Sequence, residues 1–231
     1  MSEEKHEAPD SNPDTEAWQA LQPEKRDKIF SVAVDEFSKG YSSASMNSLA
    51  KAAGISKGSI FNYFRSKGDL FDRILEVTLK QVKKYLRGVQ EETRDLGFAE
   101  RLGELLRSGF RFIDRHPRLA SIYFNTLAGG EAPYRSRQLA MITRSSTNYL
   151  EDLVEDAQRT GEIAPTVPSR RLAFLINAMF ERILSAYYTE QLARDMDLYR
   201  ADRQTQEEWI ALFCDLVRGQ LGSTAQGEND E

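Results

Sequence analysis

Two short helical patterns meet at Gly54, and they limit the fold of this chain more than any other feature. The apolar residues of each pattern recur at helical spacing and so share one face: Met46, Leu49, Ala50 and Ala53 in the first, Ile60 and Phe64 in the second. Ser45 and Ser56 directly precede the two patterns, where a hydroxyl accepts a hydrogen bond from a free backbone N–H. Gly54 permits the positive φ of a sharp turn. The segment 45–64 is therefore predicted to be a helix-turn-helix.

The second helix of this unit leaves polar and aromatic side chains on its outer face. Once Ile60 and Phe64 point inward, the surface that remains carries Lys57, Gly58, Ser59, Phe61, Asn62 and Tyr63. This is the layout of a recognition helix, whose N-terminal residues enter the major groove of DNA. Core packing is the alternative role for Phe61 and Tyr63.

The run Leu49–Phe64, followed by Ser66-Lys67 and Asp69-Leu70, resembles the DNA-binding domain of the TetR/AcrR family of transcriptional regulators. The resemblance covers about residues 24–75, including the long helix before the motif. It implies that DNA is contacted by Ser45, Asn47, Ser56, Lys57, Gly58, Ser59, Phe61, Asn62, Tyr63 and Lys67. Ser45 and Lys67 would meet phosphates, and Lys57 to Ser59 would face base edges. Phe61 stands where the family usually has Tyr, so a hydroxyl contact to phosphate is missing.

The charge of the chain agrees with this placement only when it is divided by segment. The whole chain has a net charge of −5, but residues 23–70 hold eight basic and five acidic residues, a local net charge of +3. Residues 1–22 hold six acidic residues and one lysine, together with Pro and Ser. Because local field rather than overall charge attracts phosphate, only the segment 23–70 suits a DNA interface.

Helical patterns separated by Gly and Pro residues predict an all-α fold of about nine helices and no sheet. Helical patterns run from Pro23 to Gly40, through the motif, from Lys67 to about Arg94, and then near 98–115, 118–128, 134–160, 169–195 and 204–221. We expect a disordered acidic tail at 1–22, a DNA-binding domain at 23–70, a helical effector-binding and dimerisation domain at 71–222, and a second disordered tail at 223–231.

The last two helical patterns are apolar around most of their circumference, which is unusual for a surface helix. We expect them to form a homodimer interface that includes Trp209, Phe213, Leu216 and Val217; a fully buried central helix is the alternative. The family resemblance implies a ligand cavity in the same domain. Its candidate lining residues are Phe110, Tyr123, Phe124, Met141, Tyr149, Phe174, Asn177 and Phe180, although plain core packing is the alternative for each.

These features together predict a transcriptional regulator that binds a palindromic operator as a dimer. We expect a repressor, released by an apolar or amphipathic effector; an activator, or an effector-independent DNA-binding protein such as a nucleoid or division factor, is the alternative. The sequence has no hydrolase elbow, phosphate loop or His-Glu-x-x-His motif, so no enzyme is expected, and no cofactor. The single Cys214 argues against a disulfide or a multi-cysteine metal site, and no metal is expected. Without a secretory signal or an apolar run of about 20 residues, a cytoplasmic protein that does not contact membranes is expected.

Overall fold

The computed structural model describes residues 16–128 and 135–221. Most of the expected acidic tail and all of the expected C-terminal tail at 223–231 lie outside these residues. The described chain is all-helical and holds ten α-helices and one 3₁₀ helix, without a β-strand. The helices are α1 (Glu16–Gln19), α2 (Pro23–Phe37), α3 (Met46–Ala53), α4 (Lys57–Tyr63), α5 (Lys67–Glu92), α6 (Phe98–Arg115), α7 (Pro117–Leu127), α8 (Arg135–Thr160), α9 (Ser169–Tyr188), η1 (Glu190–Leu192) and α10 (Arg203–Leu221).

The expected disordered tail ends earlier than the sequence predicted, because α1 is ordered on the N-terminal core. Trp18 is buried, and its ring lies 4.8 Å from that of Phe64 and 6.1 Å from that of Tyr63, centroid to centroid. An indole buries a large apolar area, and this holds a four-residue helix that its acidic surroundings did not predict. This helix is the one that raises the number of helices above nine.

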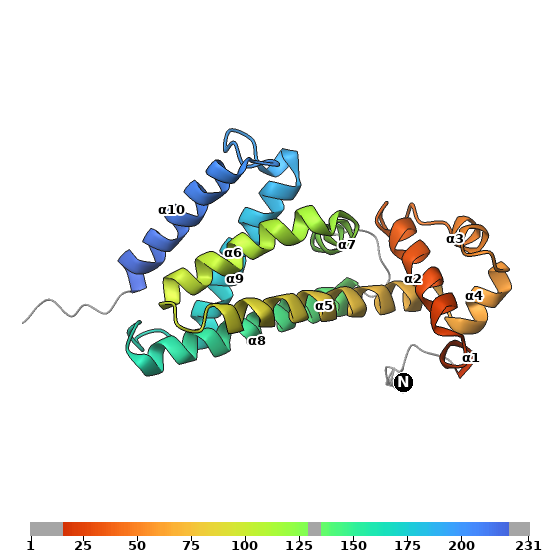
Figure 1. Ribbon diagram of the computed structural model, residues 1–231, viewed down its shortest axis with the longest axis horizontal. Coiled ribbons are helices and arrows are strands. Elements are labelled where there is room, and N and C mark those ends of the chain that lie inside the picture. The colour runs from red at the N-terminus through yellow and green to blue at the C-terminus, as the bar shows by residue number, and fades with distance from the viewer. Residues whose placement is uncertain (1–15, 129–134, 222–231) are drawn as a thin grey trace, which may run out of the picture.

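Helices α2, α3 and α4 pack at one end of the molecule, around the beginning of α5 (Figure 1). Their core contains Ile29, Phe37, Leu49, Ile60 and Phe64, each at most 1% exposed. This core does not stop at residue 70, since it includes side chains of α5 as far along as Leu79. It also takes in Ile122 of α7 and Ile142 of α8.

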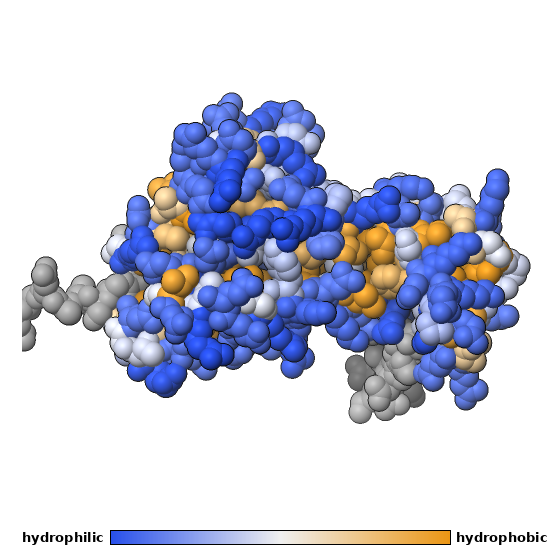
Figure 2. Space-filling view, viewed as in Figure 1, coloured by the Kyte–Doolittle hydropathy of each residue, from blue (hydrophilic) through white to orange (hydrophobic). Residues whose placement is uncertain are grey.

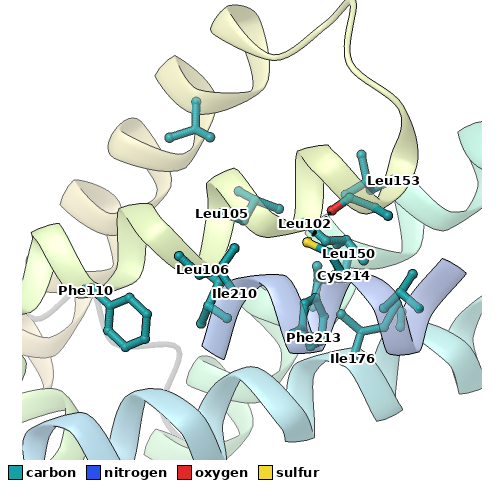
Figure 3. Close-up of a cluster of buried hydrophobic side chains, with 14 of the residues drawn as sticks. Leu102, Leu105, Leu106, Phe110, Leu150, Leu153, Ile176, Ile210, Phe213 and Cys214 are labelled. Atoms are coloured by element: carbon teal, nitrogen blue, oxygen red, sulfur yellow. Dashed lines mark hydrogen bonds between the residues drawn. The ribbon is translucent and has the colours of Figure 1, made fainter. Parts of the chain in front are cut away.

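Helices α6 to α10 form a second, larger core at the other end (Figure 1). Close packing between α6 and α10 depends on Gly103, because a Cβ there would lie 2.8 Å from the sulfur of Cys214. The Cys214 thiol donates a hydrogen bond to the carbonyl of Ala99 over 3.2 Å. Figure 3 shows Ile210, Phe213 and Cys214 of α10 among the leucines of α6.

Helix α5 runs from the N-terminal core along the larger domain, and further contacts join the two ends (Figure 1). The buried amide of Gln138 on α8 donates to Asp72 of α5 over 2.6 Å. The hydroxyl of Ser121 on α7 donates to the carbonyl of Ser38, just after α2, over 2.7 Å. The N-terminal core therefore rests on three helices of the larger domain: α5, α7 and α8.

Candidate nucleic-acid interface and internal cavity

Helix α3 is fixed at both ends by the residues that the sequence singled out. The Ser45 hydroxyl accepts from the backbone N–H of Ser48 at 3.2 Å, and Gly54 has the left-handed φ of 73° that turns the chain. Met46, Leu49, Ala50 and Ala53 are buried, as their spacing predicted. Asn47 is exposed on the opposite side of the same helix.

Glu36 on α2 also holds the beginning of α3, a role that sequence reasoning missed. Its Oε1 accepts from the backbone N–H of Ser45 at 2.7 Å, and its Oε2 accepts from the Lys39 ammonium at 2.6 Å. These two hydrogen bonds, that of Lys39 first, hold the pKa of the Glu36 carboxyl below its usual value. The sequence carried no signal for this contact, because Glu36 and Ser45 are nine positions apart and meet only when the chain between them turns back.

Helix α4 displays its polar residues as a recognition helix does. Ser56 caps it by accepting from the N–H of Ser59 at 3.0 Å, while Ile60 and the following Phe64 are at most 1% exposed. Lys57, Gly58 and Asn62 lie exposed, and Ser59 is half-buried. Phe61 is 38% exposed and Tyr63 is half-buried against Trp18, so simple core packing does not describe Phe61.

Lys67 lies at the first turn of α5, beside the two motif helices. Ser66 caps this helix by accepting from the N–H of Asp69 at 3.0 Å. The Lys67 ammonium lies 4.6 Å from the centroid of the Tyr41 ring, a cation–π contact. Partial burial lowers the pKa of Lys67 and the charge of Glu36 opposes that shift.

An internal cavity of about 140 Å³ lies in the larger domain, between α5, α6, α7, α8 and α9. Five of the eight candidate residues line it: Tyr123, Phe124, Tyr149, Asn177 and Phe180. The lining also includes residues that sequence reasoning did not select, among them Val82, Tyr85, Leu86, Ser108, Phe112, Glu181 and Leu184. Those on α5 were missed because every candidate was taken from the helical patterns after residue 98.

Two of the cavity candidates were wrong, and one cannot be placed. Phe110 is fully buried with its ring 4.9 Å from that of Tyr187, so it belongs to the solid core. Phe174 is 56% exposed on the outer side of α9. The Met141 side chain lies outside the described part of the structure.

The outer faces of α9 and α10 carry the apolar surface that the expected dimer requires, with one correction. Phe213 and Val217 are buried in the protomer's own core, at 5% and 3% exposure, and are not on this face. Their places are taken by Phe174, Leu175 and Leu212, which are more than half exposed, as is Leu216. Trp209 is half-buried and lines the shallow groove between the two helices together with Leu212 and Leu216.

Residues 29–74 match the family model of the bacterial regulatory proteins of the tetR family. The chain is 27% identical over 146 residues to YhgD of Bacillus subtilis, named an HTH-type transcriptional regulator, with 63% of this chain and 75% of YhgD covered. The fold matches a TetR family transcriptional regulator from Chloroflexus aurantiacus with a TM-score of 0.65 and 25% identity, over 90% of this chain and 98% of the other. The helix-turn-helix domain of this chain is that of the tetR family of bacterial regulatory proteins.

The chain is a helix-turn-helix transcriptional regulator with a TetR-type DNA-binding domain. The same fold occurs in the regulator FadR of Bacillus subtilis, whose structure was determined in complex with stearoyl-CoA. That likeness has a TM-score of 0.63 at 17% identity, over 81% of this chain and 96% of FadR. In the described parts of this regulator, none of the helices is both long and apolar enough to span a membrane.

Proposed function

We propose that this regulator is a repressor that binds an inverted-repeat operator as a homodimer and leaves it when a small molecule enters the cavity. The exposed face of α4 carries the DNA-binding part of this proposal. Lys57 can reach a base edge or a phosphate, Gly58 leaves room for close approach of the backbone, and Asn62 can bond a base edge. Ser45, Asn47, Ser56, Ser59, Phe61, Tyr63 and Lys67 complete the proposed contact surface.

The apolar face of α9 and α10 supports the dimer. Leu175 of α9 lines one groove with Leu212 and Leu216 of α10, and Phe174 is exposed beside Leu175 on α9. Exposed apolar side chains gathered in this way mark an interaction surface. A second copy that presents the same face would bury them by two-fold symmetry. The half-sites on DNA would then lie about one helical turn apart, ~34–36 Å or a multiple.

Helix α7 supports a link between the cavity and DNA. One face of it lines the cavity through Ala120, Tyr123 and Phe124, and another face meets the N-terminal core through Ser121 and Ile122. A ligand that displaces Tyr123 or Phe124 would move α7 and so shift α2 and the motif helices packed on it. The coupling needs only about 1–3 kcal/mol to change operator affinity by roughly 5–150-fold.

Selection of genomic fragments by the purified protein, followed by footprinting, tests the DNA-binding part. The expected result is a protected inverted repeat whose half-site spacing follows the helical repeat. Lys67→Ala should weaken binding to operator and random DNA alike and lower the salt slope by about one unit, as for one lost phosphate contact. Asn62→Ala should instead relax preference at one or two positions, by ~1–3 kcal/mol each. Equal effects of both variants on operator and random DNA would contradict this division of roles.

An activator and an effector-independent DNA-binding protein are the competing functions. Transcription of a reporter behind the selected operator separates a repressor from an activator, since deletion of the regulator raises expression in the first case and lowers it in the second. An effector-independent protein would hold its operator in the presence of every compound that binds the cavity.

A further inference from the structure

The described lining of the cavity combines many aromatic side chains with a single carboxylate. This lining is apolar apart from a few groups, and Glu181 of α9 is the only carboxylic acid among these described residues. Among the residues that the structure describes, no Lys, Arg or His belongs to this lining. Six aromatic rings surround the space: Tyr85, Phe112, Tyr123, Phe124, Tyr149 and Phe180.

Glu181 has one satisfied oxygen and one that no described group of the protein reaches. Its Oε1 accepts from the amide of Asn177 over 2.8 Å, and among the described residues no donor or cation bonds its Oε2. Burial raises the pKa of the carboxyl, against the smaller effect of the Asn177 hydrogen bond. A carboxylate in apolar surroundings is stabilised most by a cation that also donates hydrogen bonds.

The phenol of Tyr123 is a second polar group of the same cavity. Its ring lines the cavity, and no hydrogen bond is made by its hydroxyl within the described structure. Burial first, and the nearby charge of Glu181 second, raise the pKa of this phenol well above its usual value. A ligand group placed near both residues would meet one anionic acceptor and one hydroxyl.

The size of the cavity limits the ligand as well. At about 140 Å³ it is close to an apolar cavity of ~150 Å³ that accommodates one benzene molecule. A single ring or a short branched chain therefore fits without rearrangement of the walls.

We propose that this cavity takes a compact apolar amine, whose ring packs among the aromatic side chains and whose ammonium group pairs with Glu181. The aromatic faces favour a cation over a neutral donor because their quadrupoles attract positive charge. A carboxylate or phosphate would meet the Glu181 carboxylate and, among the described lining residues, no basic group to pair with. This proposal rests on the proposed effector function of the cavity and specifies the chemistry of what enters it.

A neighbouring groove marks the main competing ligand chemistry. It lies between α5 and α6, carries Lys84, Arg111 and Arg115, and shares Tyr85 and Phe112 with the cavity. A longer acid could place its chain in the cavity and its charged end in this groove. The test therefore compares both charges on one body.

Calorimetric titration with benzylamine, benzyl alcohol and benzoate, each a single ring with a one-carbon substituent, tests the proposal. The amine should bind at least about tenfold more tightly than the alcohol or the acid. Glu181→Gln keeps an acceptor for Asn177 but removes the charge, so the amine should no longer bind more tightly than the alcohol. Glu190→Gln, at an exposed carboxylate of η1, is the matched control and should retain the preference.

Three outcomes would overturn the proposal: tightest binding of the acid, survival of the amine preference in Glu181→Gln, or no binding of any of the three compounds at millimolar concentration. Gel-shift competition with the operator reports on the proposed function separately. An amine that binds in a Glu181-dependent way but does not release DNA would support the ligand chemistry and refute the effector role. Release of DNA by a compound whose affinity is unchanged in Glu181→Gln would support the effector role of the cavity and refute the proposed ligand chemistry.

Discussion

The hydroxyl of Ser121 on α7 donates a hydrogen bond to the backbone carbonyl of Ser38 at the end of α2, over 2.7 Å. This bond spans 83 positions of sequence and joins the cavity domain to the DNA-binding core. It satisfies a backbone acceptor at the C-terminal end of α2, where helices leave carbonyls without partners. On the same helix, Ala120 directly before Ser121 and Tyr123 two positions after it line the cavity. The bond therefore joins a helix of the cavity wall to the end of α2.

Loss of this bond should loosen the last turn of α2. We expect Ser121→Ala to lower the free energy of unfolding by about 1 kcal/mol, because one part-buried hydrogen bond is removed. Hydrogen exchange at the C-terminal end of α2 should be faster. Ser43→Ala, at an exposed serine of the following turn, is the control and should change neither measurement. Unaltered exchange in Ser121→Ala would show that the bond does not hold α2.

A methyl group at position 58 should separate DNA binding from stability. The Cβ of Gly58→Ala would meet only the Ser56 hydroxyl, at an ordinary 3.7 Å, so the fold accepts it. Removal of a helical glycine should raise stability by up to about 1 kcal/mol. Operator affinity should fall, by about tenfold for each 1.4 kcal/mol of lost contact, because the backbone can no longer approach DNA as closely.

Gly88→Ala in α5 is a matched control for that substitution. A Cβ there meets nothing within 4 Å, and the residue lies within α5, four positions before its last residue. The same gain in stability with unchanged operator affinity is expected. Unchanged operator affinity in Gly58→Ala, measured by fluorescence anisotropy, would remove Gly58 from the interface.

The exposed leucines of α10 should control the oligomeric state. Light scattering at micromolar concentration should give about twice the 26.3 kDa mass of the chain. Leu212→Glu or Leu216→Glu should yield a folded monomer, since a charge would be buried in the interface. Phe213→Glu should instead reduce the thermal stability of the protomer itself, because this ring is in its core. Gln204→Glu, at the exposed beginning of α10, should remain dimeric.

Glu36 should make the stability of the DNA-binding domain depend on acid pH. The pKa of Glu36 is lowered in the folded state by Lys39 and by the N–H of Ser45, so its stabilisation is complete above the ordinary value of 4.5 and is lost as the pH falls below it. Glu36→Gln removes the charge but keeps an acceptor, and should cost about 1 kcal/mol at neutral pH. Thermal unfolding of both proteins from pH 7 downward measures the difference. A gap that stays constant below pH 4.5, or widens there, would contradict this role for Glu36.

The sequence by itself determined the local elements, because their signals lie within a few residues. The caps at Ser45 and Ser56 and the left-handed turn at Gly54 are all present as predicted. The buried residues of α3 and α4 also follow directly from helical periodicity. The same holds for the bounds of α6 and α8, which fall within a residue or two of the predicted patterns.

Only the tertiary structure decided which apolar side chain faces which neighbour. Periodicity marks Phe110, Phe174, Phe180 and Phe213 equally as apolar, but packing sends the first into the core, the second outward, the third into the cavity wall and the fourth against α6. Trp18 shows the same limit, since its partners are more than forty residues away in sequence. Burial depends on contacts between helices distant along the chain, and one helix's pattern does not encode the position of the next.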